Sequence, residues 1–265
     1  MTAVAVVTIV RGRADHLARQ RRLLAAGPPV LHVVVGMGEE PDLSGPAPST
    51  RSVTVPAPGP LPLAAARNAG ARAALTAGAG LLVFLDVDCL PGPVLVDRYR
   101  AAAARTGPAL LAGPVTFLPP PGPAGVPERD LARWVDPHPG RPDPPDGALR
   151  PEPRRELFWS LSFALAAGSW TGTGGFDEGY RGYGAEDTDF ALACELPLYW
   201  VGGAHALHQY HPPSRTDPGQ AGGIVANARR FHGRWGRWPM EPWLRELAAS
   251  GAVVFDPEHD VLRLP

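Results

Sequence analysis

The sequence predicts one α/β domain of Rossmann-like arrangement, with a mostly parallel central sheet and helices on both of its faces. Three observations support this prediction. Apolar runs of strand length alternate with helical segments over the first hundred residues, which favours right-handed crossovers between parallel strands. A length of 265 residues is long for one small domain and short for two full domains. Hydrophobic residues make up 45% of the chain and charged residues 19%, which excludes a wholly disordered protein.

The first part of the chain alternates strands and helices. Continuous apolar runs with β-branched residues are typical of strands that are buried on both faces. A helix can begin at Asp15, as a cap, and end at Gly27-Pro28. The expected strands are residues 4–10, 30–35, 81–85 and 110–117, with a short one at 52–55. The expected helices are residues 15–26, 63–77 and 93–105.

The second part of the chain begins with a proline-rich segment, residues 118–156, which we expect to be a long loop with one helical turn at 130–135. Further along, we expect strands at 157–165 and 198–201, a glycine-rich loop at 171–184, and helices at 186–195, 222–234 and 241–249. We therefore divide the chain into a catalytic domain, residues 1–213, and a helical extension packed on it, residues 214–265.

Composition excludes several classes of function. The net charge of −1 gives no general attraction to nucleic acid or to an anionic membrane. All 25 basic residues are arginines, so Schiff-base and P-loop lysine chemistry is excluded. Cys89 and Cys194 stand outside any CxxC motif, which argues against a disulfide scaffold or a cysteine zinc site. No apolar run approaches the ~18 residues of a membrane span, and the N-terminus lacks a signal-peptide pattern, so we expect a cytoplasmic protein.

Two aspartates, Asp86 and Asp88, directly follow the apolar run 81–85. Alternate residues of an extended segment point the same way, so both carboxylates can converge on one target. Ligands bind at the carboxyl ends of strands in parallel sheets, and carboxylates suit Mg²⁺ or Mn²⁺. Alternatively, the aspartates only cap the helix that follows.

Acidic residues also end the glycine-rich segment that runs from Gly174 to Asp187. Glycines allow the backbone to approach a ligand closely, and Glu186 and Asp187 offer a candidate general base. Alternatively, the segment is a turn before an acidic helix N-terminus.

Three histidines, His205, His208 and His211, lie within seven positions and could ligate a metal. The HExxH motif of zinc proteases is absent.

Together these motifs resemble the glycosyltransferases of the GT-A fold, closest to family 2. The matching segments are 84–91 for the DxD strand, 174–187 for the GGFDE…GxGxED pattern and 66–70 for the RNxG segment of family 2. Residues 9–17 resemble the nucleotide-binding opening of β-1,4-galactosyltransferases, except that Gly12 replaces an asparagine. His208-Gln209 resembles the HQ segment of bacterial glycosaminoglycan polymerases. After the second strand only Glu39 is acidic, which leaves the nucleobase open.

The resemblance implies roles for the polar residues. Asp88 and His208 would bind Mn²⁺ or Mg²⁺, with His205 and His211 as alternatives to His208. Asp86 would contact the ribose or the metal's hydration shell. Asp187 would be the catalytic base, and Glu186 would hold substrate hydroxyls.

The resemblance also implies the binding surfaces around these groups. The residues that would border the nucleotide are Arg11, Arg13, Arg67 and Asn68. Gly174 and Gly175 would line the donor sugar, and Tyr183 would pack against a sugar face. We interpret the proline-rich segment, residues 118–156, as a loop on the acceptor side, and we expect its Trp134 to face the acceptor. One of Arg229, Arg230, Arg234 and Arg237 would reach the diphosphate.

The implied function is a metal-dependent inverting glycosyltransferase that uses a nucleotide-diphosphate sugar, with a UDP-sugar favoured, and a small-molecule or glycan acceptor. Two alternatives stay open. A nucleotidyltransferase would need a glycine-rich phosphate loop, for which the sequence offers only Gly12. A non-catalytic nucleotide-sugar-binding homologue would be expected to lack Asp88 or Asp187, and both are present.

Overall fold

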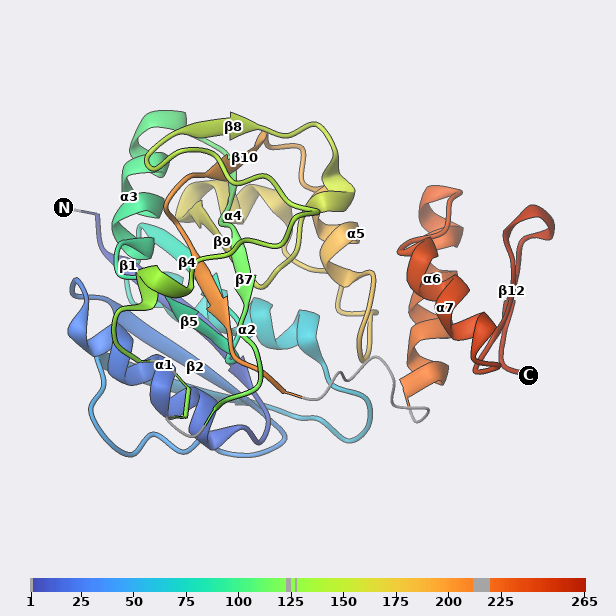
Figure 1. Ribbon diagram of the computed structural model, residues 1–265, viewed down its shortest axis with the longest axis horizontal. Helices are drawn as coiled ribbons and strands as arrows, with labels where there is room; N and C mark the ends of the chain where they lie inside the picture. The colour runs from blue at the N-terminus through green and yellow to red at the C-terminus, as the bar shows by residue number, and fades with distance from the viewer. Residues whose placement is uncertain (1, 123–124, 127, 212–219) are drawn as a thin grey trace.

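The structure is a computed structural model that describes residues 2–122, 125–126, 128–211 and 220–265 (Figure 1). The expected boundary between residues 213 and 214 lies outside the described residues, as do residues 123, 124 and 127 of the proline-rich segment.

An eight-stranded sheet forms the centre of the molecule, in the order β3-β2-β1-β4-β9-β6-β10-β8. Strands β3, β2, β1 and β4 are parallel, β9 runs antiparallel between β4 and β6, and β10 is again parallel to β6. The mostly parallel sheet is therefore confirmed. The strands are β1 (Val4–Val10), β2 (Leu31–Met37), β3 (Ser49–Val55), β4 (Leu81–Leu85), β6 (Leu110–Ala112), β8 (Leu149–Pro151), β9 (Ser162–Ala166) and β10 (Leu198–Val201).

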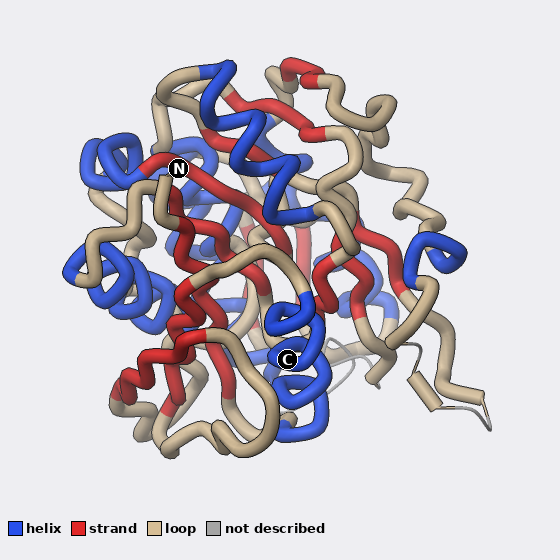
Figure 2. The backbone as a smooth tube through the Cα atoms, turned by 90° about the vertical axis from the view of Figure 1, so that its left-hand side faces the viewer, coloured by secondary structure: helices blue, strands red, loops and turns tan. Residues whose placement is uncertain are grey.

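Helices pack on both faces of this sheet, as expected (Figure 2). One face packs against α2 (Leu63–Thr76), α4 (Ala167–Thr173) and α5 (Glu186–Ala193). The opposite face packs against α1 (Ala14–Ala26) and α3 (Leu95–Thr106). The central strands β1 and β4 are buried along their whole length because both of their faces are covered.

A small second sheet brings distant parts of the chain together in the order β5-β11-β7. Its strands are β5 (Cys89–Pro91), β7 (Val115–Phe117) and β11 (Ala206–His208). The register places His208 opposite Cys89 on one side and opposite Phe117 on the other. This sheet therefore places His208 next to the end of the DxD turn.

The prediction of one strand at 110–117 is wrong, because β6 and β7 belong to different sheets. Gly113 lies at the break, where a Cβ atom would stand 2.2 Å from the carbonyl oxygen of Ala204. The close passage of the 204 backbone needs a glycine there, and Pro114 follows it without an N–H to continue a ladder.

Three further details differ from the sequence predictions. The strand expected at 157–165 begins only at Ser162, because the backbone N–H of Phe158 donates to Arg155 and closes a short 3₁₀ turn, Arg155–Leu157. The start of the loop expected at 171–184 belongs to α4. Asp15 lies inside the first turn of α1, and Arg13 takes the capping position with no side-chain hydrogen bond.

The C-terminal part consists of α6 (Ala221–Trp235), α7 (Glu241–Ala249) and the hairpin β12 (Val254–Asp256) and β13 (Val261–Arg263), which share an apolar core. It lies at the α5 side of the molecule in Figure 1. Phe231 of α6 packs with Tyr180 and Ala185, and the amide of Asn227 donates to the backbone of Arg181. Among the described residues, no helix is long and apolar enough to cross a membrane.

Candidate functional site

An open cavity of about 910 Å³ lies at the carboxyl ends of β1 and β4. Its walls come from the DxD turn, from residues 156–161 and 183–188, and from residues 237–243 of the C-terminal part. The predicted site residues that line it are Arg11, Arg13, Arg67, Asp86, Asp88, Tyr183, Glu186 and Asp187.

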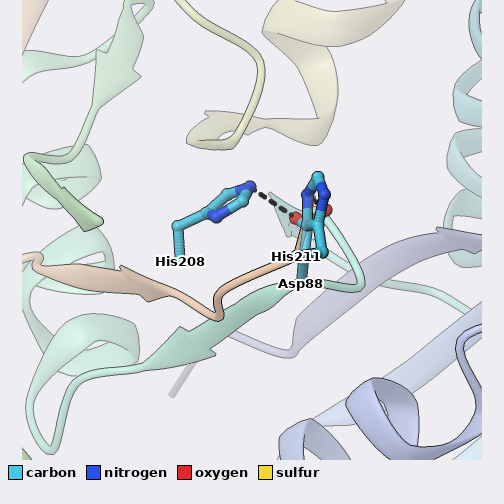
Figure 3. Close-up of side chains that lie close together, drawn as sticks. All are labelled: Asp88, His208 and His211. Atoms are coloured by element: carbon cyan, nitrogen blue, oxygen red, sulfur yellow. Dashed lines mark ion pairs between the residues drawn. The ribbon is translucent and has the colours of Figure 1, made fainter. Parts of the chain in front are cut away.

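Asp88 and two histidines form a candidate metal centre at this end of the sheet (Figure 3). Nε2 of His208 is 3.5 Å from Oδ1 of Asp88, and Nε2 of His211 is 3.4 Å from Oδ2. The three potential ligand atoms lie within 4.8 Å of one another. His205 is directed elsewhere, with its Nε2 3.6 Å from Oδ1 of Asp143. Both His208 and His211 thus stand at Asp88, whereas His205 does not.

The electrostatics of this centre favour metal ligation. Burial alone would raise the pKa of the Asp88 carboxyl, but a hydrogen bond from His211 and the charges of His208 and Arg13 lower it to about 2. Burial lowers the pKa of His208 from its usual value. The centre therefore offers an ionised carboxylate and a neutral imidazole, which are the forms that bind metal ions.

A buried polar chain fixes the backbone of the DxD turn. Nε2 of Gln20 donates to the carbonyl oxygens of Asp86 and Cys89, both at 2.8 Å. Oε1 of Gln20 accepts from Thr8, and the backbone N–H of Gln209 donates to the carbonyl of Asp88. The turn is held on both sides by residues that do not reach the metal centre.

Arg67 joins the two acidic motifs. Its Nη2 lies 3.0 Å from Oδ1 of Asp86, and its Nη1 lies 3.3 Å from Oε1 of Glu186. Burial raises the pKa of Asp86 to about 6 and that of Glu186 to about 7, while the charge of Arg67 opposes both shifts. The guanidinium is itself almost fully buried, so it acts as the counterion of both carboxylates.

Asp187 presents a carboxylate to the cavity. Its Oδ1 accepts from the backbone N–H of Thr188 at 2.7 Å. Burial raises the pKa of Asp187, against the opposing effects of the Thr188 hydrogen bond and the Arg67 charge. A carboxylate with a raised pKa is the stronger proton acceptor, so Asp187 has the properties of a general base.

Three predicted binding residues lie outside the cavity lining: Asn68, Gly174 and Gly175. The amide of Asn68 accepts from the backbone N–H of Phe176 and donates to its carbonyl, both at 2.9 Å. A Cβ atom on Gly175 would stand 2.6 Å from Oδ1 of Asn68. In the structure these residues fix the loop that leads to α5.

The remaining candidates, namely Trp134, Glu39 and the C-terminal arginines, do not gather at the cavity. Trp134 is 42% exposed and is not part of the cavity wall. Glu39 accepts a hydrogen bond from the backbone N–H of Gly12. Of the four C-terminal arginines, only Arg237 lines the cavity, while Arg230 pairs with Asp177 and Arg234 with Asp189.

The cavity has walls that the sequence did not reveal. Trp238 and Met240, between α6 and α7, and Trp243, in the first turn of α7, add large apolar side chains to the lining. On another side, Trp159 lies beneath the guanidinium of Arg141, whose Cζ is 3.4 Å from the ring centre. The abundance of tryptophan near the C-terminus was the one available signal, but tryptophans are as common in cores.

Comparisons with known proteins were made at the levels of family, sequence and structure. No model of a known protein family matches the chain. Validoxylamine A glucosyltransferase of Streptomyces hygroscopicus subsp. jinggangensis (strain 5008) is 30% identical over 185 residues, covering 62% of this chain and 43% of that protein. The protein of the same name from subsp. limoneus is also 30% identical, with 40% of it covered. The chain thus spans less than half the length of these relatives.

Two solved structures are similar to this chain. S. aureus TarS 1-349 aligns with a TM-score of 0.55 and 13% identity, over 87% of this chain and 65% of TarS. GalNAc-T7, solved with UDP, GalNAc and Mn²⁺, aligns with a TM-score of 0.52 and 16% identity, over 85% of this chain and 48% of GalNAc-T7. At such identities the similarity establishes a shared fold.

Proposed function

The chain has the GT-A fold of these glycosyltransferase structures, as its motifs predicted, and on this premise we propose that it is a metal-dependent inverting glycosyltransferase. The substrate would be a nucleotide-diphosphate sugar, and the sugar would pass to an acceptor hydroxyl. One observation carries the proposal: Asp88, which stands with two imidazoles at the candidate metal centre, lines the same cavity as the candidate base Asp187. The names of the relatives, which are glucosyltransferases, support the same reaction class.

The proposed metal ligands are Asp88, His208 and His211. One carboxylate oxygen and two imidazole nitrogens suit Mn²⁺ better than Mg²⁺, because Mg²⁺ prefers oxygen ligands. Mn²⁺ is also the ion named with GalNAc-T7. When bound, the ion would act as a Lewis acid that offsets the charge building on the departing diphosphate.

Asp187 would take the proton from the acceptor hydroxyl. A carboxylate opposite the leaving group activates the incoming oxygen for an in-line displacement, which inverts the configuration of the sugar. Glu186, held by Arg67, would hold substrate hydroxyls rather than move the proton. This assignment follows the surroundings of the two side chains, because Glu186 already pairs with the guanidinium.

We propose residues 1–213 as the nucleotide-sugar-binding and catalytic domain and 214–265 as an extension that completes the cavity. Trp238 and Trp243 of the extension provide flat apolar surfaces of the kind on which sugar rings stack. UDP is the nucleotide we favour, in line with the UDP of the GalNAc-T7 structure. The acceptor would be a small molecule or a glycan.

The test is calorimetric titration of the chain with UDP, GDP and dTDP, in Mn²⁺ and then in EDTA. We expect one nucleotide to bind in Mn²⁺ only and to raise the melting temperature accordingly. Asp88→Ala should abolish the Mn²⁺ dependence, whereas Asp97→Ala, an exposed aspartate on α3, should not. Failure of every nucleotide to bind under both conditions would contradict the proposal.

A further inference from the structure

Arg141 of the proline-rich segment reaches into the cavity and is held there by stacking. Its Cζ atom lies 3.4 Å from the centre of the Trp159 ring, and both residues line the cavity. Nη1 donates to the carbonyl oxygen of Gly140 at 2.9 Å. The stacking and the hydrogen bond fix the plane of the guanidinium, so the group is pre-organised rather than free to move.

The charge of Arg141 has no close counterion among the described residues. Of the other arginines that line the cavity, Arg13 pairs with Asp88 and Arg67 pairs with Asp86 and Glu186, whereas Arg11 and Arg237 are exposed to solvent. No carboxylate that the structure describes lies within 4.0 Å of the Arg141 nitrogens, and its buried Nε has no hydrogen-bond partner. Burial lowers the pKa of Arg141 to about 10, and the charge of Asp187 opposes the shift.

A half-buried cation without a counterion is unfavourable in free energy. A neutral hydroxyl could fill the hydrogen bond but would leave the charge uncompensated. A carboxylate or phosphate would satisfy both, because two of its oxygens match the planar donor edge of a guanidinium. Asp187, the proposed catalytic base, lines the same cavity as Arg141.

We propose that Arg141 is a subsite for an acidic group, a carboxylate or a phosphate, on one of the sugars bound in the cavity. The inference rests on the proposed glycosyltransferase function and adds a property of the substrate to it. The acidic group can belong to the sugar of the donor or to the acceptor, and the two sources share the same chemistry at Arg141.

The experiment compares charged and neutral sugars by calorimetry on the whole chain in Mn²⁺. The donor arm titrates UDP, UDP-glucose and UDP-glucuronate. The acceptor arm titrates glucose, glucuronate and glucose 6-phosphate into the chain saturated with UDP. Each titration is repeated with Arg141→Gln and with Arg133→Gln, which removes an exposed arginine of the same segment outside the cavity.

We expect the acidic sugar of one arm to bind at least about tenfold more tightly than its neutral counterpart, as a charge-assisted pair allows. Arg141→Gln should remove this preference and leave UDP and neutral sugars unchanged, whereas Arg133→Gln should keep it. The arm that shows the preference identifies its source.

Two results would overturn the inference while leaving the proposed function in place. One is the absence of any preference for acidic sugars in a chain that binds UDP with Mn²⁺. The other is an equal loss of UDP itself in Arg141→Gln, which would assign the arginine to the diphosphate. If no nucleotide binds at all, the proposed function fails and the inference fails with it.

Discussion

Glu186 and Asp187 are neighbours in sequence and share a buried setting, yet their partners differ. Glu186 faces the guanidinium of Arg67, whereas Asp187 accepts a backbone hydrogen bond from Thr188 and borders the cavity. Burial raises the pKa of both carboxyls. Both side chains are carboxylates, so the separate roles proposed for them rest on their different partners.

Replacing Asp187, the proposed base, should separate nucleotide binding from turnover. Asp187→Asn keeps the size of the side chain and removes its ability to accept a proton at neutral pH. We expect turnover to fall by about 10² to 10⁴, with nucleotide affinity in Mn²⁺ unchanged. Assays of sugar transfer and calorimetry on the same preparation measure the two quantities. A variant that retains its turnover would exclude Asp187 as the base.

The raised pKa of Glu186 predicts a pH-dependent stability. Between its ordinary value of 4.5 and its folded value of about 7, the folded chain binds more protons at this site than the unfolded chain. Stability from this group is therefore complete below pH 4.5 and is lost as the pH rises to about 7. In Glu186→Gln the glutamine side chain does not titrate. The free energy of unfolding of this variant, relative to that of the wild type, should therefore rise by about 1 to 3 kcal/mol between pH 4.5 and pH 7.

Urea unfolding at pH 4.5, 6 and 8 measures this difference. The exposed substitution Glu195→Gln serves as the control, and it should follow the wild type at each pH. A constant difference between Glu186→Gln and the wild type would show that the carboxyl titrates normally.

At the scale of elements, α1 supports the DxD turn through Gln20. The side chain is fully buried, and its amide donates to both ends of the turn. Gln20→Leu would remove this donor from both carbonyls, and the carbonyl of Asp86 would keep only its bond from the backbone N–H of Cys89. We expect Mn²⁺ affinity to fall roughly tenfold to a hundredfold, as is usual for groups that orient metal ligands.

A control must separate this effect from a general loss of stability. Leu24→Ala removes a buried apolar side chain of the same helix, one turn away from Gln20, and should destabilise the chain by about 2 to 5 kcal/mol. Its Mn²⁺ affinity should nevertheless stay at the wild-type level. Equal losses of affinity in the two variants would mean that Gln20 serves only the stability of α1.

The regular elements were predictable where one local pattern decided them. Apolar runs identified β1 and β4, and the bounds expected for α7 match the structure. The short strands β5, β8 and β11 were missed, because three residues carry no period and depend on partners far along the chain. The alternating pattern at 157–161 reflects burial of a turn instead of a strand.

The candidate site was predictable to the same extent. Asp86, Asp88, Glu186 and Asp187 were found because short motifs carry their chemistry, and all four line one cavity. The family resemblance put His208 first, with His205 and His211 as alternatives, but the residues alone could not rank them, since their distances from Asp88 depend on the pairing of β11. Gln20 and Arg141 belong to no motif, and only packing reveals them.

At the scale of the whole molecule, Asp189 ties the C-terminal part to the sheet. It is 1% exposed and accepts hydrogen bonds from Tyr180, Arg234 and the indole of Trp235. Asp189→Ala would leave these donors unpaired at the junction of α5 and α6. We expect a loss of about 1 to 3 kcal/mol in the free energy of unfolding, because the buried hydroxyl of Tyr180 would lose its acceptor, whereas Arg234 is 44% exposed and can be solvated.

Chemical unfolding followed by tryptophan fluorescence measures this loss. Asp260→Asn removes the charge of an exposed partner of His232, keeps a residue that tolerates the left-handed backbone at this position, and should change stability by at most about 0.5 kcal/mol. A similarly small change in Asp189→Ala would mean that the apolar contacts of Phe231 alone hold the two parts together.

The three-stranded sheet β5-β11-β7 also bears on how the molecule is assembled. Asp88 and His208 approach one another only after that sheet has closed a very long loop, a step with a large entropic cost. Such distant contacts form late in folding. A partly folded chain would thus hold Asp88 and His208 apart. In a refolding experiment, the time at which the chain binds a metal ion would then report when the sheet β5-β11-β7 has formed.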